Sequence, residues 1–411
     1  MRYFGRRQMR KHPQHADESA GLLYHARAAT PFCSPDGEPC ASIPAGIDAR
    51  RVVPLRSAAF RDWITANYYS EFEAAPSPLA LQAALRALEA RARYGESPAQ
   101  KVGRRLSFEG DPYTPSKIIL DLATSAGETL EITSRGWNVA NNLSHSFFQS
   151  PATLPLPHPA EPPASSHQTL SGFSQLFRLQ GATRTRVLTW LVNALRPNGP
   201  YPILVIQGPA SSGKSTLALA LRALVDPSSA PLRRLPARGR ELLDLARQNW
   251  ILVFDQVRRV PPNISDALCA LSAGEAVEIS QPDSREPLVF ELARPMILVA
   301  PDDDPRRAWT PPHSLAYRTL EVSLPLLHSP RPEAEPWAAL EALRPALLGS
   351  LATAVSAGLR NLRETDVGNV ARFPDCAAWA AAAAPALGLE QNEIVEAVSV
   401  PSAGALVPTH G

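Results

Sequence analysis

One eight-residue segment, Gly208-Pro-Ala-Ser-Ser-Gly-Lys-Ser215, constrains this chain more than any other feature. It has the pattern G-x-x-x-x-G-K-S. It lies between an apolar run over 202–207, typical of a buried parallel strand, and a helix-forming run over 216–225. Only four lysines occur in the chain, so chance rarely puts one after a glycine pair. The alternative is an ordinary Gly/Ser loop. We predict an α/β fold with a phosphate-binding loop.

The residue types of this loop suit phosphate binding. Gly208 and Gly213 let the backbone turn so that its N–H groups face phosphate oxygens, and the following helix adds the positive end of its dipole. Lys214 is expected to reach the β- and γ-phosphates, and the Ser215 hydroxyl to bind magnesium. The residues predicted to bind ATP are Gly208, Pro209, Ala210, Ser211, Ser212, Gly213, Lys214, Ser215 and Thr216.

A second apolar run, over 249–254, ends in Asp255. The carboxyl ends of parallel strands meet at one edge of a sheet, so Asp255 is expected to face Ser215 and to help hold magnesium. The alternative is an aspartate that caps a buried strand. Gln256 follows, where many such ATPases carry a second acid. An amide can orient the attacking water but cannot take its proton, so the sequence is compatible with slow hydrolysis.

Two more strands, over 294–300 and 319–324, complete the predicted core. The first ends near Val299, where comparable ATPases offer a polar side chain to the γ-phosphate. Arg318 precedes the second, a place from which ring-forming ATPases extend an arginine finger into the neighbouring subunit. The alternative is a surface arginine in an arginine-rich chain. The predicted catalytic residues are Lys214, Asp255, Gln256 and Arg318.

A β-hairpin is predicted over 276–292, with Arg285 near its tip. In ring helicases a hairpin at this place points into the central pore, so Arg285 is a candidate contact to the backbone of single-stranded DNA. The alternative is a solvated polar tip. Both interpretations remain open on the sequence alone.

Composition excludes several classes of protein. The formal net charge is +2 over 411 residues, which neither requires nor excludes a nucleic-acid partner. Four cysteines are too few for a disulfide scaffold, and Cys33 and Cys40 lack the second pair that a zinc site needs. The most apolar window, 377–389, is too short to span a bilayer, and no secretory segment follows the basic N-terminus. We expect a cytoplasmic protein with no membrane partner.

The chain is predicted to consist of five segments. They are a flexible basic and polar tail over 1–20, an N-terminal α+β accessory domain over 21–149, a Pro-rich linker over 150–168, the ATPase core over 169–328 and a C-terminal helical subdomain over 329–411. The linker is inferred from six prolines between 151 and 163.

Several stretches carry a resemblance to a known group of proteins. They are residues 199–206, 208–215, 221–227, 254–255, 268–269, 294–298, 331–335 and Trp337, with 34–37 and 132–137 nearer the N-terminus. From about Pro31 to Leu387 the chain resembles ATP-binding proteins of phages and integrated elements, described as primase- or helicase-like. The nucleotide core is similar to that of superfamily 3 helicases in the AAA+ class.

The resemblance implies ATP binding by Gly208–Ser215, magnesium at Ser215 and Asp255, and an arginine finger at Arg318. Two residues depart from the family's pattern: Val299 stands where such proteins usually have Asn, and Gln256 also stands where Asn is usual. No primase or polymerase centre is evident. These departures leave the residues expected to bind nucleotide unchanged. They affect positions that such proteins use for hydrolysis and unwinding.

The leading hypothesis is an ATP-binding P-loop NTPase of a mobile element. It would couple Mg-ATP binding and hydrolysis to helicase- or primase-associated work on DNA, as a homo-oligomer. The alternative is an ATP-gated binding or regulatory module with little or no hydrolysis, favoured by Gln256 and Val299. A small-molecule kinase is a third reading, against which stands the lack of an arginine-rich lid between paired helices.

Overall fold

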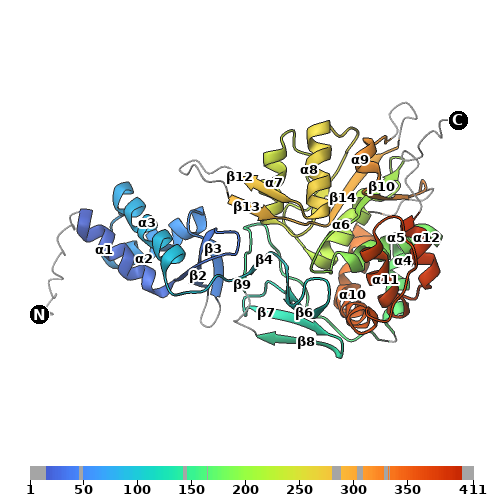
Figure 1. Ribbon diagram of the computed structural model, residues 1–411, viewed down its shortest axis with the longest axis horizontal. Helices are drawn as coiled ribbons and strands as arrows, with labels where there is room; N and C mark the ends of the chain where they lie inside the picture. Colours follow the sequence, from blue (N-terminus) through green and yellow to red (C-terminus); the bar gives the residue numbers. More distant parts are fainter. Residues whose placement is uncertain are drawn as a thin grey trace, which may run out of the picture. The chain divides into compact units, whose positions relative to one another are not determined.

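The computed structural model describes residues 15–45, 50–141, 146–163, 165–279, 288–302, 309–327, 332 and 334–399. The chain divides into two compact units, Met1–Val102 with Leu143–Phe148, and Gly103–Asn142 with Gln149–Gly411. Figure 1 traces the order of helices and strands in each.

The first unit is a small α+β fold. Its elements are α1 (His15–His25), the 3-10 turn η1 (Ala26–Ala28), an antiparallel sheet of β1 (Thr30–Cys33), β2 (Pro39–Pro44) and β3 (Arg50–Pro54), then α2 (Ala58–Phe72) and α3 (Pro78–Tyr94). The hydroxyls of Ser57 and Ser77 cap α2 and α3. The helix α1 begins inside the predicted tail because Leu22 is buried in the core of this unit. Short strands β4 (Val102–Gly103) and β9 (Ser146–Phe147) form a second sheet.

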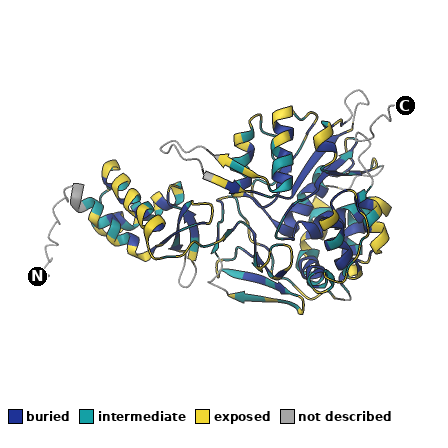
Figure 2. Cartoon of the chain, in the orientation of Figure 1, coloured by how far each residue is buried: buried dark blue, intermediate teal, exposed yellow. Residues whose placement is uncertain are grey.

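The second unit is built round a four-stranded parallel sheet. In spatial order its strands are β11 (Leu252–Phe254), β14 (Met296–Pro301), β10 (Ile203–Gly208) and β15 (Thr319–Ser323). Alternate residues of β10 face opposite sides: Leu204 and Ile206 join one hydrophobic cluster, Ile203 and Val205 another. Figure 2 shows the buried centre of this unit in dark blue. A parallel sheet buried on both faces confirms the predicted α/β class.

Helices cover both faces of this sheet. On the face of Leu204, the hydrophobic cluster includes side chains of α5 (Gly181–Asn193) and α6 (Lys214–Val225). On the face of Val205, it includes side chains of α7 (Gly239–Gln248) and α8 (Pro262–Ala273). The predicted hairpin is present as β12 (Ala276–Ile279) and β13 (Leu288–Glu291). Arg285 lies outside the described residues. A short helix, α9 (His313–Ala316), precedes β15.

An antiparallel sheet also belongs to the second unit, although we predicted it within an accessory domain over 21–149. Its strands are β5 (Leu106–Gly110), β6 (Pro115–Asp121), β7 (Glu128–Thr133) and β8 (Gly136–Asn141). Leu120 and Ile132 lie in the same hydrophobic cluster as the side chains of α5 and α6. The division differs from the predicted boundary because an alternating pattern shows which face of a strand is buried, but not which neighbour covers it.

The Pro-rich segment over 150–163 lies within the second unit as well. Three of its backbone N–H groups donate hydrogen bonds of 2.9–3.0 Å to the carbonyls of Pro227, Leu122 and Pro345. We predicted a linker over 150–168. The segment instead crosses the surface of one unit, and α4 (Ser166–Leu176) starts before the predicted end of the linker.

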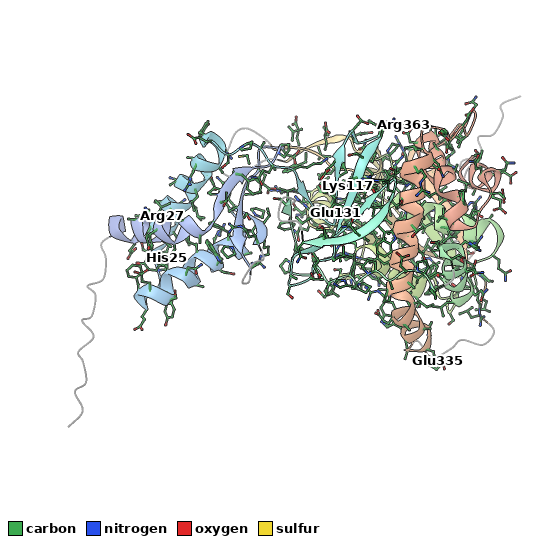
Figure 3. All side chains as sticks on the ribbon, turned by 90° about the horizontal axis from the view of Figure 1, so that it is seen from below. His25, Arg27, Lys117, Glu131, Glu335 and Arg363 are labelled. Carbon is green, nitrogen blue, oxygen red and sulfur yellow. The ribbon has the colours of Figure 1, made fainter. Side chains whose placement is uncertain are left out.

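Three helices lie in the range that we predicted to be a helical subdomain, and they belong to the second unit: α10 (Ala334–Asn361), α11 (Pro374–Leu387) and α12 (Gln391–Ser399). Helices α10 and α11 pack with α4, and α11 and α12 pack with α5. Length and composition alone would let α10 cross a membrane, but 56% of its most apolar window is buried inside the protein. Figure 3 shows this helix with Glu335 at its start and Arg363 beyond its end.

Candidate functional site

The glycine-rich loop connects β10 to α6 at the carboxyl edge of the parallel sheet. Gly208 has φ +153° and Gly213 has φ +81°, conformations that residues with a side chain rarely adopt. A Cβ atom on Gly208 would lie 2.7 Å from both the Leu324 carbonyl oxygen and Ser212 Oγ. Only glycine therefore fits at the start of the loop.

The loop leaves polar atoms unsatisfied. Helix α6 starts after Gly213, and no side chain caps it, so the N–H groups of its first turn are available to an anion. Within the described part of the chain, the buried Ser212 Oγ has no hydrogen-bond partner. Buried polar atoms normally have one, so this orphan indicates a place for a polar ligand. Pro209 is half-buried and Ala210 is exposed at the turn of the loop.

Lys214 and Ser215 open α6 and point to different partners. Lys214 is 7% exposed, and its Nζ donates a hydrogen bond to the Pro209 carbonyl at 2.8 Å. Ser215 Oγ lies 3.3 and 3.2 Å from the two carboxylate oxygens of Asp255 and donates to them. The structure thus brings Ser215 and Asp255 together, as their places in the sequence led us to expect.

Asp255 follows β11, which is separated from β10 by β14. The backbone N–H of Asp255 donates to the Arg233 carbonyl at 2.8 Å. Asp255 Oδ1 accepts a hydrogen bond from the N–H of Gln256 at 2.8 Å. These bonds orient the carboxylate toward the loop. Gln256 has φ +58° and is exposed beside Asp255.

Val299 contributes only backbone to this edge. Its side chain is fully buried, and its carbonyl accepts a hydrogen bond from the N–H of Val257 at 2.9 Å. The next polar side chain along the chain is that of Asp302, which is exposed, while its N–H bonds the Gly208 carbonyl. The strand β14 therefore ends without a polar side chain aimed at the loop from position 299.

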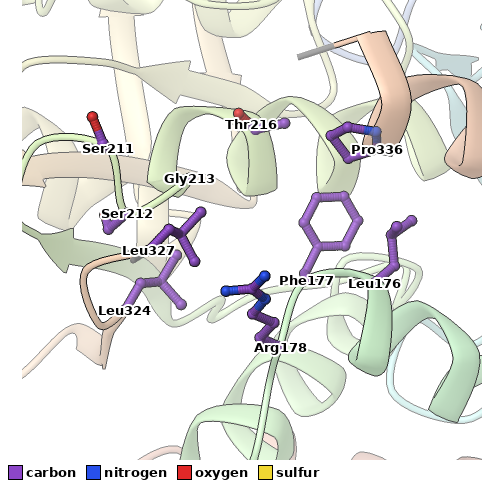
Figure 4. A pocket seen from close by; sticks show the side chains of 10 residues that line it. All are labelled: Leu176, Phe177, Arg178, Ser211, Ser212, Gly213, Thr216, Leu324, Leu327 and Pro336. Atoms are coloured by element: carbon purple, nitrogen blue, oxygen red, sulfur yellow. The ribbon is translucent and has the colours of Figure 1, made fainter. Parts of the chain in front are cut away.

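A cavity of about 370 Å³ opens beside the loop (Figure 4). Its ten lining residues come from the loop and α6, from the end of α4, from the segment after β15 and from the start of α10; they are Leu176, Phe177, Arg178, Ser211, Ser212, Gly213, Thr216, Leu324, Leu327 and Pro336. Four of them belong to the predicted nucleotide site, so the cavity adjoins that site.

Phe177 and Arg178 were not predicted from the sequence. They lie in the turn between α4 and α5, which carries no motif of its own. Sequence reasoning therefore had no signal that would place this turn beside the loop. Arg178 has φ +54°, a backbone conformation unusual for a residue with a side chain.

Arg318 is not close to the loop of its own chain. Its carbonyl accepts a hydrogen bond from the N–H of Ile203 at 2.8 Å, which places it where β10 and β15 begin, whereas the loop lies where β10 ends. The buried Arg372 donates to the carbonyls of Tyr317 at 3.0 Å and Thr319 at 2.8 Å, on either side of Arg318. Arg318 therefore lies at the edge of the sheet opposite the loop of its own chain.

The donor atoms at the loop fit magnesium better than a transition metal. Ser215 and Asp255 offer oxygen atoms, which Mg²⁺ prefers, and such sites take most of their other ligands from phosphate and water. Among the described residues, no three His, Cys, Asp or Glu side chains gather as a metal cluster. The orphan Ser212 Oγ and the glycine turn fit a phosphate chain.

Comparison with known proteins identifies one family. Residues 173–398 match the actinomycete integrative conjugative element replication proteins. The matched range includes the loop, Asp255, Arg318 and the three C-terminal helices. No curated protein matches the chain.

Solved structures show more distant similarity. The apo A form of the NrS-1 C-terminal region has a TM-score of 0.43 and 11% identity, over 82% of this chain and 68% of that one. A second apo structure of that region (305–718) has a TM-score of 0.40 and 10% identity, over 83% and 70%. JCV helicase bound to a thiazolopyridine-containing acetamide has a TM-score of 0.27 and 13% identity, over 57% and 74%.

Proposed function

The chain belongs to the family of actinomycete integrative conjugative element replication proteins, and from this premise we propose that it binds Mg-ATP at the glycine-rich loop and hydrolyses it to do work on DNA. The working form is a homo-oligomer in the cytoplasm, in which Arg318 of one subunit completes the site of the next.

The contact between Ser215 and Asp255 carries this proposal. A hydroxyl at the start of α6 and a carboxylate at the end of β11 lie 3.2 Å apart, although 40 residues separate them in the sequence. A serine and an aspartate so placed beside a glycine turn are the two protein ligands that P-loop NTPases use for magnesium. Bound magnesium would neutralise charge on the phosphates.

The other residues of the loop have distinct tasks in this proposal. Lys214 Nζ donates to the Pro209 carbonyl, which belongs to the same loop. When nucleotide binds, a charged phosphate oxygen would replace this carbonyl as the acceptor. Gln256 orients the attacking water from beside Asp255. The cavity takes the sugar and base, because Phe177 and Leu176 offer apolar surface there.

ATP turnover tests the proposal directly. We would measure phosphate release with and without single-stranded DNA, over a range of protein concentrations, for wild type, Lys214→Ala and Arg318→Ala. Wild-type turnover per subunit should rise as the protein assembles, Lys214→Ala should show none, and Arg318→Ala should stay low at every concentration. The helicase-like hypothesis is wrong if the protein neither self-associates in the presence of ATP nor binds single-stranded DNA at low salt.

Single-stranded DNA is the proposed partner, and the hairpin of β12 and β13 is its proposed contact. Arg285→Ala should weaken binding to all sequences alike and lower the slope of log K against log salt by about 0.7, as expected for one phosphate contact. An unchanged slope would remove the hairpin from the interface.

A second candidate is an ATP-gated binding module with little hydrolysis. Two observations favour it: Val299 offers no polar side chain to the loop, and Gln256 stands where an acid would activate water. ATP would then switch assembly or DNA binding without rapid turnover. Fast DNA-stimulated hydrolysis that disappears in Lys214→Ala would exclude this candidate.

A further inference from the structure

Unusual backbone conformations gather round the candidate site. Among the described residues, six that are not glycine have positive φ, and three of these are Arg178, Ser211 and Gln256. Ser211 belongs to the loop, Gln256 follows Asp255, and Arg178 lines the cavity. Residues are held in such conformations at ligand sites when the surrounding structure determines the backbone.

The backbone of Arg178 is held on both sides. The N–H of Phe177 donates to the Phe173 carbonyl at 3.2 Å, and the N–H of Leu179 donates to the Ser174 carbonyl at 2.7 Å. Leu179 is 3% exposed and belongs to the core. The turn between α4 and α5 therefore requires a left-handed residue at position 178, where glycine or asparagine would fit with less strain than arginine.

The side chain of Arg178 points into the cavity. Figure 4 shows its guanidinium extending from the turn toward the space between the loop and Phe177. None of the ten lining residues is acidic, whereas the unpartnered Ser212 Oγ and the uncapped start of α6 at Gly213 lie at the same space. A cation so placed fits an anion bound between the turn and the loop.

We infer that Arg178 binds the phosphate chain of a nucleoside di- or triphosphate, at the phosphates nearest the sugar. This inference rests on the proposed nucleotide site, in which the cavity takes the sugar and base, and it adds a cation from the same chain that lines this cavity, whereas Lys214 does not line it. Arg178 occupies a position of unfavourable backbone conformation because its side chain contacts the ligand.

Calorimetric binding of ADP and of Mg-ATP to the full chain tests this inference, with Arg178→Asn and Arg178→Lys as variants. The matched control is Arg363→Asn, because Arg363 is exposed beyond the end of α10, about 40 Å of helix from Pro336 at the cavity. Arg178→Asn should weaken both nucleotides about 10- to 100-fold, the range for hydrogen bonds to charged groups. Arg178→Lys keeps the charge and should lose less.

Thermal unfolding without nucleotide separates ligand contact from structural support. Asparagine tolerates the left-handed conformation, so the Tm of Arg178→Asn should equal or exceed that of wild type while its affinity falls. A variant that binds both nucleotides like wild type, or one that loses affinity only along with several degrees of Tm, overturns the role of Arg178. If wild type itself binds neither nucleotide, the proposed nucleotide site fails first, and this inference with it.

Discussion

Arg105 and Asp226 form a buried ion pair in the second unit. Arg105 Nε lies 3.0 Å from Asp226 Oδ1, and the two side chains are 0% and 9% exposed. The other oxygen of Asp226 accepts hydrogen bonds from the N–H groups of Trp250 and Ile251, just before β11. Asp226 itself follows α6. One carboxylate thus ties the antiparallel sheet to the helix and the strand that carry Ser215 and Asp255.

Removing one partner of this pair should destabilise the protein strongly. Arg105→Ala leaves a buried carboxylate without its cation, so we expect a loss of about 3–5 kcal/mol in the free energy of unfolding, measured with denaturant. The double change Arg105→Met with Asp226→Asn should lose less than Arg105→Met alone, since no charge is left buried and an amide oxygen at position 226 can still accept from the N–H groups of Trp250 and Ile251. Lys117→Ala, which breaks a partly exposed pair with Glu131 on the neighbouring strand (Figure 3), should lose about 1 kcal/mol or less.

Gly208→Ala should abolish nucleotide binding. The new Cβ would collide with the Leu324 carbonyl and with Ser212 Oγ, so the loop must move away from its turn. Gly127→Ala is the matched control: Gly127 also has a positive φ, but no atom lies within 4 Å of its added Cβ. It should cost about 1–2 kcal/mol of stability and leave nucleotide affinity unchanged. Equal affinity in both variants would contradict the geometry described for the loop.

Magnesium should act through Ser215 and Asp255. In wild type we expect Mg²⁺ to raise ATP affinity, and in Ser215→Ala or Asp255→Asn this gain should fall by about tenfold or more, while affinity in EDTA stays similar. Asp302→Asn provides the control, since Asp302 is an exposed acid near the loop whose backbone alone contacts Gly208. The hypothesis is wrong if Asp302→Asn removes the magnesium effect and Asp255→Asn does not.

Arg372 should control how Arg318 is presented to a neighbouring subunit. Its guanidinium fixes the carbonyls of Tyr317 and Thr319, and burial lowers its pKa. Arg372→Lys should lower kcat of the assembled protein about tenfold or more and change KM little. Arg360→Lys alters an exposed arginine bonded to the Ser134 carbonyl and should change neither. Full kcat in Arg372→Lys would argue against Arg318 as a finger.

The elements around the loop could be predicted because local patterns determine them. Four short apolar runs became the four strands of the parallel sheet, and the glycine turn identified where the strand gives way to α6. The pairing of Ser215 with Asp255 followed from one rule, that parallel strands end at a common edge. No long-range information was needed for these steps.

Other features depend on contacts between distant segments. The sheet β5–β8 joins the second unit through Trp137 and Thr353, which are 216 residues apart. The Pro-rich segment gained its place from hydrogen bonds to Leu122, Pro227 and Pro345, none of which its own composition indicates. Phe177 and Arg178 became site residues only because α4 packs against α10 and its end lies at the cavity beside the loop. Periodicity carries no information about such partners.

The antiparallel sheet also limits which parts of this chain could be recombined separately in evolution. The family match begins at residue 173, yet Leu120 and Ile132, which precede it, lie in the same core as α5, α6 and α10. A gene fragment encoding only the matched range would expose the surfaces that this sheet covers. Recombination should therefore preserve the sheet together with the matched range, or replace it with another segment that covers the same surfaces.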